Sequence, residues 1–171
     1  MYRVIQFLSQ GEFPSPNKLT ELKKQGILHL LNLSGIDLFK LYTAEQLADF
    51  TIVQFTFKDV FSTGAVVKPE QIQSIDADVY CQQSSEAEKL AFFNAVQQLI
   101  DWLKHQTSSY VFCQQGIGRS PAVICSALAY FYHPPSEQIL KTIKFFNQQA
   151  VLTTISYAAA KWFETQANQI R

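Results

Sequence analysis

The 171-residue sequence lacks the features that mark several classes of protein. None of its apolar runs approaches the roughly 20 residues that a membrane-spanning helix needs, so we expect no transmembrane segment and no membrane partner. The N-terminal apolar run is interrupted by Gln6 and is followed by no small-residue cleavage site, which argues against a signal peptide. The 14 basic residues balance 14 acidic ones and form no basic stripe, so nothing in the charge predicts binding to nucleic acid.

Cysteine is also scarce. Cys81, Cys113 and Cys125 are too few to pair completely, and their spacing matches no zinc-binding pattern. We therefore expect free thiols, no metal, and a reducing compartment, for which the cytoplasm is the default.

Short apolar strands alternate with helices along the chain. The predicted strands are rich in apolar, β-branched or aromatic residues and cover 3–8, 27–33, 51–57 and 110–112. The predicted helices cover approximately 16–24, 43–49, 86–104, 120–132, 136–149 and 154–169. This alternation predicts one α/β domain, residues 1–171, with a mostly parallel central sheet of four to five strands flanked by helices.

Two of the helices carry clear start signals. Ser15 precedes Pro16 as an N-cap, and Ser85 with Glu88 forms a capping box. The helix after Ser85 is expected to bury one apolar side, made up of Leu90, Phe93, Val96, Leu99, Ile100 and Leu103.

Residues 62–83 are the least regular part of the sequence. They include Gly64, Pro69 and two aspartates, and we predict a long loop with one helical turn after Pro69. Long loops in compact domains are often lids or binding loops, so this segment is a candidate cover for a site.

Residues 113–120 read Cys-Gln-Gln-Gly-Ile-Gly-Arg-Ser and follow a buried strand, where an apolar helix begins. The two glycines let the backbone turn its N–H groups inward, and the helix N-terminus adds a positive dipole end. Arg119 can hold two phosphate oxygens, and Cys113 at the edge of this positive field is favoured as a thiolate nucleophile. The segment therefore predicts a phosphate-binding loop made of Gln114, Gln115, Gly116, Ile117, Gly118 and Arg119.

This segment resembles the Cys-x5-Arg-Ser/Thr signature of the protein tyrosine phosphatase superfamily, and 118–123 looks most like its dual-specificity branch. Residues 11–33 are similar to the opening of small dual-specificity phosphatases, and 55–59 look like the strand that delivers their acid loop. The resemblance implies a protein tyrosine phosphatase-like fold. It also implies hydrolysis of phosphotyrosine, phosphoserine, phosphothreonine or a small phosphate ester through a phosphocysteine, without a cofactor.

The resemblance further implies roles for individual residues. Arg119 would hold the phosphoryl oxygens, the Ser120 hydroxyl would favour departure of the Cys113 sulfur, and a carboxylic acid would protonate the leaving group. Asp59 is our choice for the acid because it follows the third predicted strand, where the family places it. The rival is Asp78, with Asp76 near it, because Asp78 lies 35 residues before Cys113 and Asp59 lies 54 before it.

Phe112 departs from the family pattern, which has a His immediately before the cysteine. That His donates a hydrogen bond to the loop backbone and helps the thiol to ionise, whereas Phe donates none. We therefore expect a looser loop and a slow enzyme, and keep as an alternative a phosphate- or phosphoprotein-binding module without turnover. A third hypothesis is rhodanese-like sulfur transfer, which the five residues between Cys113 and Arg119 disfavour.

Overall fold

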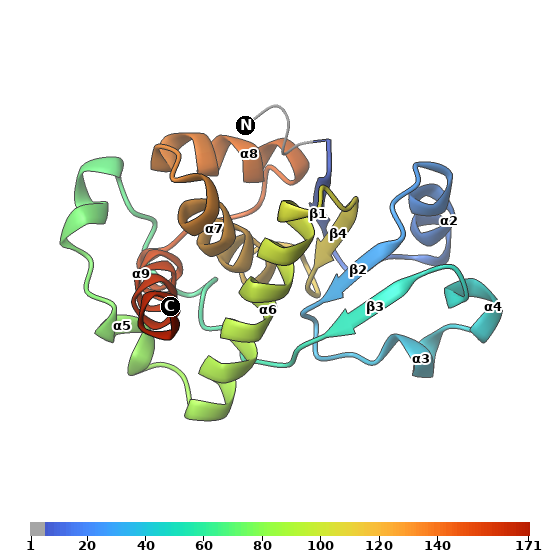
Figure 1. Ribbon diagram of the computed structural model, residues 1–171, viewed down its shortest axis with the longest axis horizontal. Coiled ribbons are helices and arrows are strands. Elements are labelled where there is room, and N and C mark those ends of the chain that lie inside the picture. The colour runs from blue at the N-terminus through green and yellow to red at the C-terminus, as the bar shows by residue number, and fades with distance from the viewer. Residues whose placement is uncertain (1–5) are drawn as a thin grey trace.

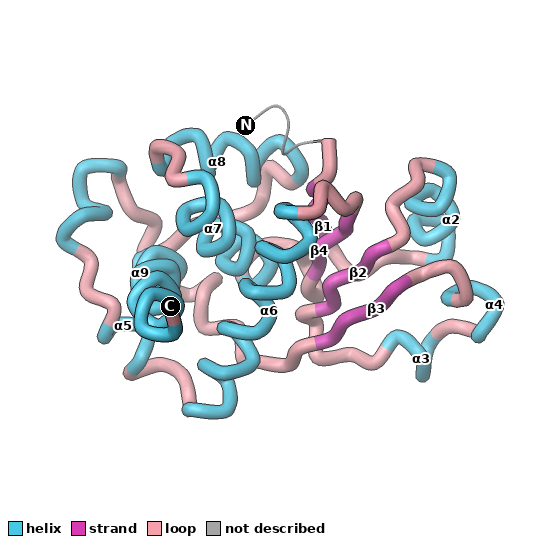
Figure 2. Tube along the Cα trace, in the orientation of Figure 1, coloured by secondary structure: helices cyan, strands magenta, loops and turns pink. Residues whose placement is uncertain are grey.

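A parallel sheet forms the centre of the computed structural model, which describes residues 6–171. Its strands are β1 (Leu8–Gly11), β2 (His29–Asn32), β3 (Thr51–Gln54) and β4 (Ser109–Phe112). They lie in the order β1-β4-β2-β3, and every neighbouring pair is parallel (Figure 2). The predicted α/β class, with four strands in a parallel sheet, is confirmed. The first strand was placed too early: of the predicted 3–8 only Leu8 is in β1, and 3–5 lie outside the described residues.

Helices cover both faces of this sheet (Figure 1). One face carries α2 (Pro16–Lys24), α3 (Leu38–Leu41) and α4 (Ala44–Leu47). The other face carries α6 (Glu86–Lys104), α7 (Arg119–Tyr132), α8 (Ser136–Phe146) and α9 (Thr154–Ile170). The chain is thus a helix–sheet–helix sandwich.

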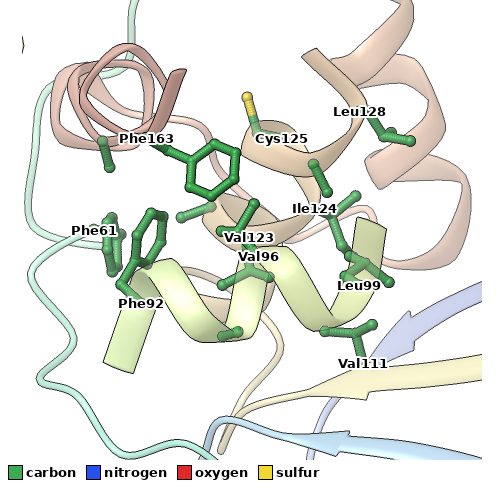
Figure 3. Packing of buried hydrophobic residues seen from close by; sticks show 14 of the residues in the cluster. Phe61, Phe92, Val96, Leu99, Val111, Val123, Ile124, Cys125, Leu128 and Phe163 are labelled. Atoms are coloured by element: carbon green, nitrogen blue, oxygen red, sulfur yellow. The ribbon is translucent and has the colours of Figure 1, made fainter. Parts of the chain in front are cut away.

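The alternation of side chains along β4 divides the core into two clusters. Tyr110 and Phe112 pack into the smaller cluster beneath α2, while Val111 and Cys113 belong to the larger one between the sheet and α6–α9. Figure 3 shows part of the larger cluster, in which Phe61, Phe92 and Phe163 lie together. Cys113 is therefore held at the end of β4 by a buried apolar core on one side.

The predicted helix starts at Ser15 and Ser85 are confirmed, but the predicted buried face of the helix after Ser85 wrongly includes Leu90. The Ser15 side chain accepts a hydrogen bond from the Lys18 amide, and Ser85 and Glu88 form the expected capping box. Leu90 is 61% exposed, because it lies nine residues before the buried Leu99 and so about half a turn off that face of α6.

The segment 62–83 contains the predicted turn after Pro69 as a 3-10 helix, η1 (Pro69–Ser74), and a short helix that was not predicted, α5 (Asp78–Cys81). Most of the segment lies on the side of α9 that faces away from the sheet (Figure 1). The Lys161 ammonium of α9 donates to the backbone carbonyls of the segment, at 2.8 Å from Ile72, 3.0 Å from Gln73 and 2.6 Å from Ile75. The segment is thus attached to α9.

We expect Lys161→Met to lower the free energy of unfolding by about 1–2 kcal/mol, since three carbonyls lose a charged donor. Urea denaturation followed by circular dichroism measures this change. Lys141→Met on α8 is the matched control, because Lys141 is exposed and makes no hydrogen bond within residues 6–171. Equal effects of the two substitutions would contradict the role given to Lys161.

Candidate active site

A tight loop, residues 113–118, joins the end of β4 to the first turn of α7. Gly116 has a φ of +70°, in the left-handed region that favours glycine. A Cβ added to Gly116 would also lie 2.6 Å from the backbone of Gly11 at the end of β1. Gly116 is therefore required both by the turn of the loop and by its close approach to β1.

Three carbonyl groups of this loop accept hydrogen bonds from the surrounding protein. The Gln114 carbonyl accepts from the Phe13 amide at 3.1 Å, and the Ile117 carbonyl from the Val151 amide at 3.0 Å. The Gly116 carbonyl accepts from the Gln10 and Asn147 side-chain amides, at 2.7 and 3.0 Å. By contrast, none of the backbone N–H groups of residues 114–118 donates to another group within residues 6–171. A loop with paired carbonyls and free amides is suited to binding an anion.

Arg119 adds a further free donor beside the loop. Arg119 is 8% exposed, and one terminal nitrogen of its guanidinium donates to the Ser34 carbonyl after β2 at 3.2 Å. Its Nε is buried and has no acceptor among the described residues. Because an unpaired buried donor is unfavourable, this nitrogen is available for an anionic oxygen.

Cys113 and Ser120 lie next to each other under the loop. Cys113 is 2% exposed, and its Sγ lies 3.4 Å from the Ser120 Oγ. The three cysteines are free thiols, as predicted. Cys125 is fully buried inside α7, and this burial raises the pKa of its thiol to about 12, which makes it inert at neutral pH.

Asp59 lies against the same loop. A Cβ added to Gly118 would be 2.7 Å from the Asp59 Oδ1 and 3.0 Å from the Ser62 amide nitrogen, so only glycine leaves room for this contact. The Asp59 carboxylate accepts from the Phe61 amide at 3.1 Å, the Ser62 amide at 3.2 Å and the Ser62 hydroxyl at 3.0 Å. These bonds keep the carboxylate beside Gly118.

Asp78 and Asp76 are placed differently. Both side chains are exposed; Asp78 begins α5, which packs on α9, and its amide donates to the Asp76 carboxylate at 2.9 Å. Within the described part of the chain, neither makes a hydrogen bond to the Cys113 loop. Of the three candidate acids, the structure brings Asp59 to the loop.

The segment 62–83 packs against the turn that carries Asp59. The Phe61 ring lies 5.5 Å from Phe92 and 5.9 Å from Tyr80, which belongs to this segment. The Phe61 carbonyl also accepts from the Thr153 hydroxyl at 2.6 Å. Tyr80 of this segment therefore packs against the turn that carries the candidate acid, and Figure 3 shows Phe61 beside Phe92 in the core.

The Phe112 side chain packs against other aromatic rings. Its buried ring lies 5.6 Å from both Phe13 and Tyr110, on the α2 side of the sheet, and gives the loop no donor. The donors that do hold the Gly116 carbonyl, Gln10 and Asn147, were missed by the sequence reasoning. A signal existed for Gln10: it shares a strand face with the buried Leu8, and a buried polar residue in a strand requires hydrogen-bond partners.

The structural comparisons agree on the fold. The chain is similar to the crystal structure of DUSP15 (16% identity, TM-score 0.61, covering 96% of this chain and 87% of that one). The chain has the protein tyrosine phosphatase fold. Human DUSP28 (11% identity, TM-score 0.60, covering 96% of this chain and 95% of that one) and PTPMT1 (12% identity, TM-score 0.61, covering 96% and 94%) have a similar fold. No protein-family model and no curated protein matches the sequence.

Residues 6–171 contain neither a candidate membrane-spanning helix nor a candidate metal cluster. No helix there is both long and apolar enough to cross a bilayer. No cluster of three or more His, Cys, Asp or Glu side chains suited to a metal ion occurs in the same residues.

Proposed function

We propose that this chain is a phosphoric monoester hydrolase that works through a phosphocysteine on Cys113. The observation that carries the proposal is the free amides of residues 114–118 in a loop that begins at a buried thiol. The free Nε of Arg119 adds a donor that suits a phosphoryl oxygen. Amide and guanidinium donors of this kind suit the oxygens of a phosphoryl group, and the protein tyrosine phosphatase fold supports the same function.

The first step is an in-line displacement at phosphorus. The Cys113 thiolate forms the S–P bond while the P–O bond to the leaving group breaks, and the loop amides and Arg119 hold the equatorial oxygens. The protonated Asp59 carboxyl gives its proton to the departing alcohol or phenol. Its place beside Gly118 supports this role.

The second step hydrolyses the phosphocysteine. The Asp59 carboxylate takes a proton from water as the water oxygen attacks phosphorus, and the S–P bond breaks to restore the thiolate. Ser120, 3.4 Å from the sulfur, donates a hydrogen bond to the departing thiolate. The products are the free alcohol or phenol and inorganic phosphate.

The proposed substrate is a phosphorylated protein residue or a small phosphate ester. A cavity of about 580 Å³ lies between the β1–α2 connection and the end of α8; Gln115 of the loop lines it, whereas Cys113, Arg119 and Asp59 do not. PTPMT1 has been crystallised with PI(5)P, whereas the loop of this chain carries the neutral residues Gln114, Gln115 and Ile117 between Cys113 and Arg119. A loop without a lysine gives an additional phosphate no cationic partner, which favours a phosphoprotein over an inositol lipid.

Hydrolysis of a generic aryl phosphate by the wild-type chain tests the proposal, with release of inorganic phosphate as the readout. Phosphate binding without release would favour the binding module, an alternative that the donor-free Phe112 ring keeps open. Conversion of cyanide to thiocyanate with thiosulfate would favour sulfur transfer instead. We further propose that residues 1–171 act as one domain in the cytoplasm, where thiols such as Cys113 stay reduced.

A further inference from the structure

Gln10 lies on β1, next to the strand that leads into the Cys113 loop. It pairs with Val111 in the register of β1 and β4, and the residue is 4% exposed. The side-chain amide nitrogen donates at 2.7 Å to the Gly116 carbonyl and at 2.9 Å to the Ser120 hydroxyl. Gln10 thus touches both the phosphate-binding loop and the residue next to the Cys113 sulfur.

The chemistry of these partners determines which way the Gln10 amide faces. A backbone carbonyl oxygen can only accept a hydrogen bond, so the atom 2.7 Å from the Gly116 oxygen is the NH₂ group. The same group then faces the Ser120 oxygen, which must act as acceptor towards it. The Ser120 proton is consequently directed elsewhere, and the Cys113 sulfur, 3.4 Å away, is the other hydrogen-bond partner that residues 6–171 provide.

We infer that Gln10 is a positioning residue that orients the Ser120 hydroxyl as a hydrogen-bond donor to the Cys113 sulfur. This inference rests on the proposed function. The oriented O–H stabilises negative charge on sulfur, both in the resting thiolate and when the thiolate leaves phosphorus in the second step. The O–H remains covalently intact throughout, because the proton that the second step releases goes from water to Asp59.

This role also explains how the site can work with Phe112. The Phe112 side chain, immediately before the cysteine, has no hydrogen-bond donor. Gln10 supplies a donor to the same loop from the adjacent strand. Asn147 also donates to the Gly116 carbonyl, at 3.0 Å, but makes no hydrogen bond to Ser120 within the described residues. Asn147 is therefore a matched control: replacing it removes a hydrogen bond to the Gly116 carbonyl but none to the Ser120 hydroxyl.

The test compares Gln10→Met, Ser120→Ala, the double variant and Asn147→Leu in pre-steady-state hydrolysis of an aryl phosphate. We expect Gln10→Met to slow phosphocysteine breakdown about tenfold, as for loss of one hydrogen bond to a charged group, and to slow its formation less. In the Ser120→Ala background the same change should have no further effect on breakdown, and Asn147→Leu should leave the ratio of the two rates unchanged. Additive effects of Gln10→Met and Ser120→Ala on the breakdown rate would overturn the inference. A change in the ratio of the two rates that is as large in Asn147→Leu as in Gln10→Met would overturn it too.

A second readout does not depend on turnover. Alkylation of Cys113 by iodoacetamide at neutral pH should slow about fivefold in both Gln10→Met and Ser120→Ala, with no further slowing in the double variant. If the wild type fails to turn over but shows this pattern, the proposed function fails and the role of Gln10 stands; an unchanged alkylation rate in Gln10→Met overturns the inference. If Gln10→Met does not fold, Gln10→Glu is used instead, because glutamate keeps the shape of glutamine and presents an acceptor to Ser120. The same slowing of phosphocysteine breakdown and of alkylation is expected.

Discussion

Cys113→Ser is expected to lower the hydrolysis of an aryl phosphate by about 10⁴-fold or more, because the serine hydroxyl is not ionised at neutral pH and cannot replace the thiolate. The variant should still bind inorganic phosphate, since the loop amides and Arg119 are unchanged. Steady-state kinetics and calorimetric titration with phosphate measure the two properties separately.

The matched control for this variant is Cys81→Ser. Cys81 is half-buried in α5, in the segment attached to α9, and has no hydrogen bond to the Cys113 loop within residues 6–171. We expect near wild-type turnover from it. Turnover that survives in Cys113→Ser, or that is lost equally in Cys81→Ser, would remove Cys113 from the mechanism.

Asp59→Asn is expected to lower kcat/KM for phenyl phosphate by about 10²-fold to 10³-fold, which is typical for loss of a general acid. The loss should be smaller for p-nitrophenyl phosphate, because its leaving group needs less protonation. Asparagine keeps the shape of aspartate and one acceptor oxygen for the amides of Phe61 and Ser62, so the turn should stay in place.

Asp78→Asn is the control for the acid, and we expect it to change kcat/KM less than twofold with either ester, as for most surface positions. The dependence on the leaving group is the decisive part of this comparison, since a purely structural role for Asp59 would affect both esters equally. A large and leaving-group-dependent loss in Asp78→Asn, with little change in Asp59→Asn, would transfer the acid role to Asp78.

The loop and its flanking elements could be predicted from the sequence because they are local. The glycine spacing, the preceding apolar strand and the following helix lie within a few residues of Cys113, and the structure forms that strand and helix in those places. Capping at Ser15 and Ser85 is local in the same sense.

The choice of acid could not be settled by sequence distance. Asp59 and Asp78 differ in their separation from Cys113, but an insertion between strand and helix changes that distance without moving the turn itself. The contact between Asp59 and Gly118 exists because Phe57, Val60 and Phe61 anchor the turn in the core, which is a tertiary effect.

Gln10 and Asn147 were missed for a related reason. They lie 106 and 31 residues from Gly116 in the sequence, and no motif spacing joins them to it. The effect of Phe112 was likewise judged from its own position, whereas a neighbouring strand supplies a donor to the loop. A missing hydrogen bond in a sheet protein has to be sought across the strands as well as along the chain.

Trapping of the covalent intermediate tests the central claim most directly. The wild-type chain is mixed with an aryl phosphate, quenched in acid within milliseconds, and its peptides are mapped by mass spectrometry. The account predicts one phosphate on the peptide that contains Cys113, and more of it in Ser120→Ala, where breakdown is slower. Product release without a phosphorylated Cys113 peptide, or phosphate on another residue, would contradict it.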